Sequence, residues 1–202
     1  MNPAMPNDLA TLTLALITSR HSVSPKRLVA PGPDAAQLQA LVEAAGCAPD
    51  HELLRPWRLV RIAPAQRAAL ADVFEEALRE RLPDADHSAR LQAREKAFRA
   101  PELLLAIARL APAHEDVPDA ERHVALGAAL QNLLLAAHGL GYAAMLTSGQ
   151  SLRTRHFAQA FTLGPGEHPV CFVSIGTPTL VKPRRRPSAH ELMSAWSPGG
   201  SR

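Results

Sequence analysis

The sequence predicts an α+β domain, and three observations support that prediction. Segments with helical spacing of apolar residues outnumber the short apolar runs that are typical of strands. Helices and strands do not alternate regularly, as the repeated βαβ units of a parallel sheet would require. The chain has 202 residues, of which 47% are hydrophobic, so it is long enough to form one domain around a substantial core.

The first part of the chain predicts two helices with recognisable ends. Asp8 can cap a helix whose leucines keep helical spacing, and this helix should end near the polar, basic loop 19–27. Asp34 can open a second helix, because Gln37 follows three residues later as in a capping box. Gly46 is a residue type that commonly ends a helix, so the second helix should stop there.

The loop 47–56 has an unusual composition for a connection between two core elements. Pro49 and Pro56 stiffen it, because each proline fixes its own φ and restricts the residue before it. Such stiffness holds a side chain in place, which a binding loop needs, and the loop carries His51. The apolar run 57–63 that follows is typical of a strand, and a third helix is predicted after it.

The second part of the chain begins with a segment, 83–98, that is charged and only weakly amphipathic. It predicts either an exposed helix or a mobile flap. The remaining predicted elements are a strand at 102–110, a helix at 121–138, a strand and turn at 142–149, a helix at 151–161, a strand at 169–178 and an irregular tail at 179–202. The helix 121–138 is apolar nearly all round, which indicates burial in a large core or against a partner subunit.

Residues 1–180 are expected to form one domain, and 181–202 a basic tail rich in Pro and Arg. The net charge is only +3, and much of the excess lies in this tail, which contains Lys182 and Arg184. A short basic run is commonly just solvated, so we do not expect nucleic acid to be a partner. The most apolar run, 124–137, is too short to span a membrane, so no membrane partner is expected either.

The cysteine content and the lack of familiar motifs argue against several further classes of protein. Cys47 and Cys171 cannot build a disulfide framework or a zinc set, and no signal peptide is evident, so a cytoplasmic protein with reduced thiols is expected. His114, Glu115 and Asp116 are adjacent in a loop, which suits solvent better than a metal. No G-x-S-x-G motif supports a serine nucleophile.

One motif match is misleading. Gly139, Gly141 and Ala144 match the G-x-G-x-x-G/A dinucleotide fingerprint. That fingerprint must follow a strand and open a helix, so that the pyrophosphate lies at the helix N-terminus. Here the glycines should close a helix and precede a strand, so we interpret them as a helix stop.

Arg20 and Ser22 together could hold a phosphate, because a guanidinium and a hydroxyl both donate hydrogen bonds. The alternative is a solvated helix end, where an arginine is favourable in any case. On local evidence alone the solvated helix end is the better interpretation.

Five separate signatures, taken together, resemble the flavin-dependent nitroreductase family. The likeness spans nearly the whole chain and is closest to the short, single-domain bacterial NAD(P)H nitroreductases. The signatures are S-R-H-S at 19–22, A-P-D-H-E-L-L-R-P-W at 48–57, A-L-Q-N-L-L-L-A-A-H-G-L-G at 129–141, L-T-S-G at 146–149 and G-T-P at 176–178. Their order and spacing make the resemblance specific, although no single signature would.

The resemblance implies a set of cofactor-binding residues. The first motif of the family grips the phosphate and ribityl chain of FMN. The implied cofactor-binding residues are Arg20, His21, Ser22, Cys47, His51, Leu146, Thr147, Ser148, Gly176, Lys182 and Arg184. His51 is expected to face the flavin site of the partner subunit. No catalytic side chain is expected, because the isoalloxazine ring itself carries the hydride.

The chain departs from the family pattern at three of these positions. His21 replaces an arginine, and a neutral imidazole makes a weaker phosphate contact. Leu146 stands where relatives often have an aromatic residue, and Cys47 stands where a basic residue is common. These departures affect the flavin wall more than the choice of cofactor.

The fold that the resemblance implies is a central mixed sheet flanked by helices, in an interlocked homodimer with FMN at the interface. The implied function is hydride transfer from NADH or NADPH to a nitroaromatic, quinone or similar small-molecule acceptor. A specialised flavoenzyme of the same family is one alternative. A non-catalytic module that binds flavin or nucleic acid is another.

Overall fold

The structure is a computed structural model that describes residues 7–110, 116–182 and 185–197. His114, Glu115 and Arg184, which the sequence analysis considered, lie outside these ranges. The strands of the described part are β1 (Leu28–Val29), β2 (Trp57–Arg61), β3 (Glu102–Arg109), β4 (Ala143–Thr147) and β5 (Glu167–Pro178). Its α-helices are α1 (Asn7–Ser19), α2 (Ala35–Gly46), α3 (Arg67–Arg81), α4 (His87–Glu95), α5 (Asp119–Gly139), α6 (Arg155–Ala160) and α7 (Ala189–Leu192).

Strand β5 is the centre of the sheet. One edge of β5 pairs with β3, which pairs in turn with β2, the opposite edge pairs with β4, and the last two residues of β5, Thr177 and Pro178, pair with β1. All of these strand pairs are antiparallel. The parallel component of the predicted mixed sheet is an isolated bridge between Ser22 and Ala144. This bridge fixes the loop that follows α1 against β4.

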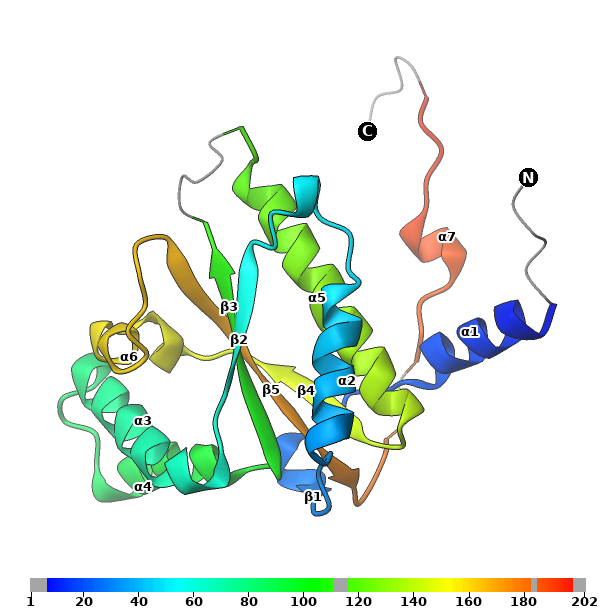
Figure 1. The fold of residues 1–202 in the computed structure, drawn as a ribbon. Helices are drawn as coiled ribbons and strands as arrows, with labels where there is room; N and C mark the ends of the chain where they lie inside the picture. Colours follow the sequence, from blue (N-terminus) through cyan, green and yellow to red (C-terminus); the bar gives the residue numbers. More distant parts are fainter. Residues whose placement is uncertain (1–6, 111–115, 183–184, 198–202) are drawn as a thin grey trace.

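Helices α2 and α5 cover one face of the sheet (Figure 1). Because side chains alternate along a strand, every second residue of β3 points into this layer. The buried sheet residues here are Leu104, Ala106, Ala108, Ala144, Cys171, Val173 and Ile175. The predicted capping box of α2 is confirmed, since the N–H of Gln37 donates to Oδ1 of Asp34 at 2.8 Å and the N–H of Asp34 donates to Oε1 of Gln37 at 3.0 Å.

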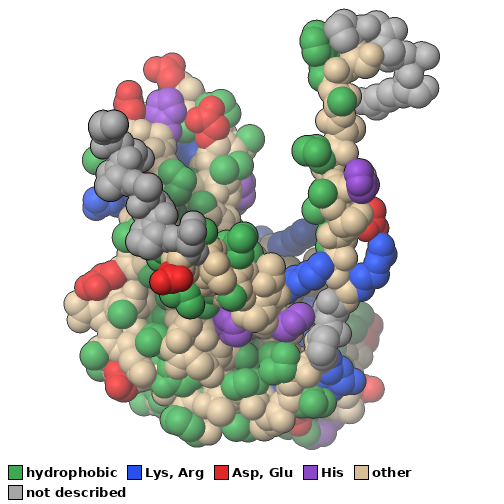
Figure 2. Space-filling model, turned by 90° about the vertical axis from the view of Figure 1, so that its right-hand side faces the viewer, with side chains coloured by type: hydrophobic (Ala, Val, Ile, Leu, Met, Phe, Trp, Pro, Cys, Tyr) green, Lys and Arg blue, Asp and Glu red, His purple; other side chains and the backbone are tan. Residues whose placement is uncertain are grey.

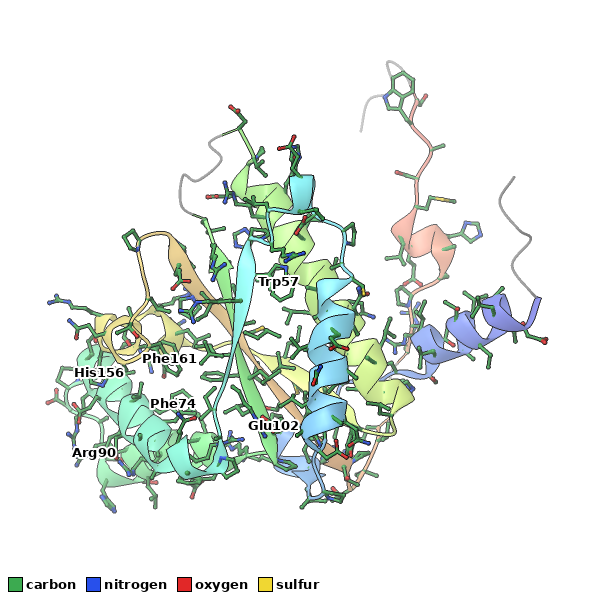
Figure 3. The ribbon with its side chains drawn as sticks, in the orientation of Figure 1. Trp57, Phe74, Arg90, Glu102, His156 and Phe161 are labelled. Carbon is green, nitrogen blue, oxygen red and sulfur yellow. The ribbon has the colours of Figure 1, made fainter. Side chains whose placement is uncertain are left out.

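Helices α3, α4 and α6 lie on the other face of the sheet (Figure 1). The intervening residues of β3 point toward them, namely Leu103, Leu105 and Ile107. Phe74 extends from α3 toward the sheet (Figure 3), and its ring meets that of Phe172 edge-on with a centroid distance of 5.5 Å. The central strands β3 and β5 therefore carry apolar side chains on both faces, as the continuous apolar run 102–110 indicated for β3.

One face of helix α5 is buried by its own chain. It packs between α2 and the sheet, and its buried residues are Arg122, Ala125, Leu126, Ala129, Leu130, Leu133, Leu134 and Ala137. The prediction of a buried helix is confirmed for this face, whereas Val124, Gly127 and Gln131 on the opposite face are exposed. Further uncovered apolar surface lies on α1 and on the C-terminal segment, which project from the body beyond α5 (Figure 1). Exposed apolar residues there are Leu9, Leu12, Leu14, Ile17, Leu192, Met193 and Trp196.

Most of the predicted elements are confirmed, and a few details differ. The charged segment 83–98 contains a helix, α4, which Asp86 caps by accepting from the N–H of Ala89 at 2.7 Å. The two-residue strand β1 was not predicted, because so short a pairing leaves no alternating pattern. The prediction of an irregular tail is wrong for α7, where Ser188 and Glu191 form a capping box.

Candidate functional site

Arg20 and Arg186 lie together at the end of α1. Nη1 of Arg20 donates to Oγ of Ser22 at 3.5 Å, and its buried Nε has no hydrogen-bond partner in the described structure. Nη2 of Arg186, in the C-terminal segment, donates to the main-chain oxygen of Arg20. Within the described ranges, neither guanidinium has a carboxylate as an ion-pair partner. Two cations are thus close to each other without an anion.

His138 lies beside this pair of cations. His138 on α5 has its Nε2 atom 2.8 Å from Oγ of Ser19. Burial lowers the pKa of His138, and the charges of Arg20 and His21 lower it further. Burial also lowers the pKa of Arg20, with the charge of Arg186 as a second cause. Both shifts have burial as their largest cause and neighbouring cations as a further cause, and an anion here would relieve the repulsion among these groups.

Figure 2 shows Lys and Arg side chains gathered at the foot of the C-terminal segment, where it meets the body of the molecule. The loop that carries the cluster is braced by β4. Ser22 forms the parallel bridge to Ala144, and the N–H of Val23 donates to the carbonyl oxygen of Ala144 at 3.4 Å. Val23 is buried against Leu28 and Ala143. The cluster is therefore held at the beginning of β4.

A pocket of about 470 Å³ opens at the other end of β4. The L-T-S-G turn lines it with Thr147, Ser148 and Gly149, and Ser24 continues the loop from Ser22 into the same pocket. Its inner wall is apolar and contains Phe74, Leu103, Met145, Leu152 and Phe172. Its remaining wall carries cations from α3 and from the segment after α4, which are Arg81, Lys96 and Arg99. An apolar wall with a few convergent polar groups is typical of a small-molecule site.

Lys96 and Arg99 belong to this pocket but were not predicted as site residues. Burial lowers the pKa of Lys96, and the charges of Arg99 and Arg81 contribute to the shift. The signal that could have found them is a pair of basic residues just before the buried strand β3. Contact between α1, α5 and the tail cannot be read from local patterns, so His138 and Arg186 were not predicted as site residues either.

Arg67 holds the segment that carries these two cations. It lies buried on α3, and its Nη1 donates to the main-chain oxygen of Ala97 at 2.9 Å while its Nη2 donates to that of Pro101 at 3.2 Å. These two acceptors lie on either side of Arg99 in the chain. Arg67 therefore restricts the backbone from which Lys96 and Arg99 extend.

The structure brings some of the predicted site residues together. Arg20, His21 and Ser22 lie in the cation cluster at the start of β4, and Thr147 and Ser148 line the pocket at its end. Whether any of them contacts a cofactor stays a prediction. The local alternative for Arg20, a solvated helix end, does not account for its buried and unpartnered Nε.

Other predicted residues lie outside both places. Leu146 points to the face covered by α2 and α5, opposite to its pocket-lining neighbours. Gly176 is buried where a Cβ atom would lie 2.6 Å from Cδ of Pro101, so packing already explains a glycine there. Lys182 is exposed, and Cys47 is exposed at the end of α2 with its Sγ 3.4 Å from the carbonyl oxygen of Glu43. Their roles as cofactor ligands stay predictions.

The loop after α2 is strained and partly exposed. Nδ1 of His51 lies 3.3 Å from Oε2 of Glu121 on α5, and both side chains are about half exposed. Glu52, Leu53 and Arg55 have φ values of 49°, 57° and 45°, which non-glycine residues rarely adopt. Such strain persists only where the surroundings enforce it, and it is often found at functional sites.

Two further classes of site were considered. In the parts of the chain that the structure describes, no group of three or more His, Cys, Asp or Glu side chains is placed to hold a metal ion. No helix in the same residues has both the length and the apolar character that a bilayer crossing demands. The glycines that match the dinucleotide fingerprint close a helix, as predicted. Helix α5 ends at Gly139, Gly141 has a φ of 86°, and β4 follows.

The fold and the site define an α+β protein with a cation cluster at one end of a strand and a small-molecule pocket at the other. The sequence model of the Nitroreductase family matches residues 17–177, and the chain belongs to this family. The chain is therefore an oxidoreductase of that family, and the resemblance of the five signatures is confirmed.

Individual relatives agree with this placement. The Escherichia coli K12 protein named "Putative NAD(P)H nitroreductase YdjA" is 30% identical over 167 residues, which are 83% of this chain and 88% of the relative. A nitroreductase-like protein of Bacillus cereus has the same fold, with a TM-score of 0.76, 20% identity and coverage of 91% of this chain and 95% of its own. A Desulfovibrio desulfuricans protein described as a "putative nitroreductase in complex with fmn" has a TM-score of 0.67, 23% identity and coverage of 92% and 97%.

Proposed function

We propose that this oxidoreductase binds FMN and transfers hydride from NADH or NADPH to a nitroaromatic, quinone or similar small-molecule acceptor. The observation that carries the proposal is the pair of unneutralised guanidinium groups, Arg20 and Arg186, at the beginning of the strand that leads into the pocket. The names of the Escherichia coli relative and of the FMN-bound Desulfovibrio structure support it.

The residues at the cation cluster fit the phosphate of FMN. The buried Nε of Arg20 has no protein acceptor in the described structure, and a phosphate oxygen would satisfy it. Ser22 supplies a hydroxyl next to Arg20, and Arg186 supplies a second guanidinium from the tail. His21 would add a weaker contact. The four groups would bind the phosphate and so orient the rest of the cofactor.

The residues of the pocket fit a flat aromatic ring. Leu103 and Phe172 offer apolar contact, and Thr147 and Ser148 offer hydroxyl groups. When bound, FMN would carry hydride between the nicotinamide and the acceptor. The chain would hold the ring in place and exclude water from its apolar side. The ammonium group of Lys96 would favour negative charge on a ring bound beside it.

The homodimer belongs to the same proposal. Leu9, Leu12 and Ile17 on α1 are exposed, as is Trp196 in the C-terminal segment, where 87% of its surface is accessible. Apolar surface of this extent on projecting elements is typical of a protein–protein interface. We infer that a second copy of the chain covers it. The motive from the sequence, the apolar helix α5, supports this inference less, because the chain itself buries one face of that helix, although Val124 on the other face is 72% exposed.

Light scattering of the purified protein tests the dimer. The wild type should give the mass of two chains, and Leu12→Glu should shift the protein toward the monomer because it places a charge in the interface. The matched control is Leu91→Glu on α4, which is also exposed and should leave the dimer intact. A monomer mass for the FMN-bound wild type would contradict the proposal.

A cytoplasmic location is part of the same expectation. Both cysteines are free, with Cys47 exposed and Cys171 buried. Burial raises the pKa of Cys171 to about 11, so that thiol should be unreactive at neutral pH. Labelling of the native protein with a thiol reagent should therefore modify Cys47 and spare Cys171.

The catalytic proposal is tested by the oxidation of NADH and NADPH by the FMN-loaded protein, with a quinone and with a nitroaromatic compound as acceptors. Acceptor-dependent oxidation is expected. FMN binding without any turnover would favour a non-catalytic flavin-binding module. Salt-sensitive DNA binding without bound flavin would favour the nucleic-acid-binding alternative.

A further inference from the structure

We propose that Lys26 and Arg99 form an anion-binding subsite beside the flavin pocket, which selects a second ligand that carries a negative group. The chemistry is that of a phosphate of the nicotinamide nucleotide or a carboxylate of an aromatic acceptor. The proposal rests on the proposed function, because it assigns the charge preference of that same site.

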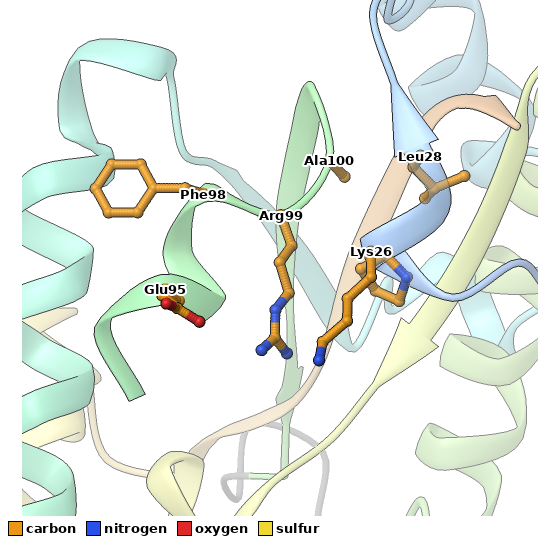
Figure 4. Close-up of a pocket in the computed structure, with 7 residues that line it drawn as sticks. Lys26, Leu28, Glu95, Phe98, Arg99 and Ala100 are labelled. Atoms are coloured by element: carbon orange, nitrogen blue, oxygen red, sulfur yellow. The ribbon is translucent and has the colours of Figure 1, made fainter. Parts of the chain in front are cut away.

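The subsite is a second pocket of about 440 Å³. It shares Pro25 and Arg99 with the pocket at the end of β4, so the two pockets adjoin each other. Figure 4 shows the side chains of Arg99 and Lys26, which both line this pocket, extending in the same direction. Apolar walls come from Pro25, Leu28, Phe98 and Ala100. A ligand with an aromatic body and an anionic end matches this combination.

The charges of the two pockets are unbalanced. Four cations line them, Lys26, Arg81, Lys96 and Arg99, against one carboxylate, Glu95. Within the described residues, none of the four cations has an ion-pair partner. Their mutual repulsion is unfavourable, and the lowered pKa of Lys96, caused by burial and then by Arg99 and Arg81, reflects it.

Other arginines of the same layer are used differently. Arg79 on α3 pairs with Glu75 and Glu76 at 2.7 and 2.5 Å, and Arg94 on α4 pairs with Glu75 at 2.8 Å. Carboxylates thus neutralise both Arg79 and Arg94. Arg99 lacks such a partner although it lies only five positions after Arg94 in the sequence. The phosphate of FMN does not explain this, because Arg20 and Arg186 are proposed to bind it.

The backbone on both sides of the subsite is braced, so the two cations need little ordering when a ligand binds. Arg67 bonds the carbonyl groups of Ala97 and Pro101, which flank Arg99. Lys26 lies in a short 3₁₀ turn, Pro25–Arg27, closed by the N–H of Arg27 donating to the carbonyl oxygen of Ser24 at 2.8 Å. A loop that only displayed solvated charges would not require these restraints.

The test compares the wild type with the double variant Lys26→Gln/Arg99→Gln. The control is Arg153→Gln, because Arg153 is an exposed cation outside both pockets. Titration with FMN comes first, because it tests the proposed function independently of the anion subsite. Calorimetry on the FMN-loaded proteins, or on the apoproteins if no FMN binds, then measures the affinity for benzoate, benzamide and inorganic pyrophosphate.

The double variant should bind benzoate or pyrophosphate about tenfold more weakly, as expected for two charge-assisted contacts at a partly exposed site. The affinity for benzamide should not change in either variant. Glu95→Gln should strengthen anion binding, because it removes the opposing carboxylate. No measurable anion binding to the wild type, or an equal loss for benzoate and benzamide, would overturn the subsite whatever the FMN titration shows.

Steady-state kinetics identify the source of the anion. If the acceptor supplies it, the KM for 4-nitrobenzoate should rise in the double variant while the KM for 4-nitrobenzamide stays unchanged. If the hydride donor supplies it, the KM for NADPH or NADH should rise while that for a phosphate-free N-benzyl dihydronicotinamide stays unchanged. Unchanged KM values for all charged substrates would also overturn the subsite.

Discussion

Nη2 of Arg186 donates a hydrogen bond to the main-chain oxygen of Arg20, which joins the C-terminal segment to the end of α1. The two residues are 166 positions apart in the chain. The contact places a second guanidinium beside that of Arg20, whose pKa is lowered by burial and by Arg186. The tail is therefore part of the candidate site, and the proposed phosphate site depends on both ends of the chain.

Replacement of Arg20 should distinguish the residue proposed to bind the FMN phosphate from the other basic residues of the same loop. Arg20→Ala should weaken FMN binding by about tenfold to a hundredfold, because a charge-assisted hydrogen bond is worth about 1.5–3 kcal/mol. The control, Arg27→Ala, should have little effect, since Arg27 lies beyond the motif. Fluorescence titration of FMN measures both. Equal affinities in the two variants would remove Arg20 from the site.

His51 is predicted to contact the flavin of the partner subunit, although in its own chain it lies 3.3 Å from Glu121. That half-exposed pair should contribute at most about 1 kcal/mol to stability. His51→Ala should therefore weaken FMN binding and leave the melting temperature of the apoprotein nearly unchanged. Glu121→Gln is the matched control. If both variants lose apoprotein stability and keep their FMN affinity, His51 only fastens the loop.

Glu167 should make the stability of the protein depend on pH in the acid range. It accepts hydrogen bonds from Nε and Nη2 of Arg58, both at 2.7 Å, from the N–H of Gly164 at 3.2 Å and from Nε of Arg109 at 3.4 Å. The bonds from Arg58 are the main cause that lowers the pKa of Glu167 from 4.5 to about 2. The charged residues of this group connect the ends of β2, β3 and β5.

Because the pKa is lower in the folded state, this stabilisation is present above the unfolded value of 4.5 and is lost as the pH falls toward about 2. Glu167→Gln should cost about 2 kcal/mol at neutral pH, after a discount for the partly exposed arginines. Denaturant unfolding of the apoprotein at several pH values measures the difference from the wild type, which should shrink through the acid range. A difference that does not change with pH would contradict this account.

Substitution of Gly176, which is predicted to contact the flavin, tests whether packing alone explains the glycine at this position. A Cβ atom there would lie 2.6 and 2.7 Å from Cδ and Cγ of Pro101 and 3.1 Å from the oxygen of Val29. Gly176→Ala should destabilise the apoprotein by about 1–3 kcal/mol. Gly127→Ala, where no atom lies within 4 Å, should instead stabilise α5 by about 1 kcal/mol. Normal apoprotein stability combined with lost FMN affinity in Gly176→Ala would favour a cofactor contact.

Much of the fold could be predicted from local chemistry. Asp34 and Gln37 form the predicted capping box, and the apolar run 102–110 becomes a central strand with side chains buried on both faces. These features depend on neighbours in the sequence, which a pattern can show. The direction in which Leu146 points, away from the pocket, depends on the register of β4 against β5, and no local pattern reports that register.

The candidate site could be predicted only in part, for a related reason. Arg20 and Ser22 are close in the sequence, so their joint role could be considered from the start. Lys96 and Arg99 precede β3, whereas Thr147 and Ser148 lie at the end of β4. These residues line one pocket only because β3 and β4 both pair with β5, which no local pattern reports. The exposed apolar face of α1 could not be anticipated either, because its leucines have the same helical spacing as those of a buried helix.

The most direct test of the central claim is a titration of the apoprotein with FMN, followed by flavin fluorescence and by the visible spectrum of the complex. The account predicts saturable quenching at one FMN per chain, a yellow protein after removal of free flavin, and weaker binding in Arg20→Ala than in Arg27→Ala. A colourless protein with no quenching at any FMN concentration would contradict it.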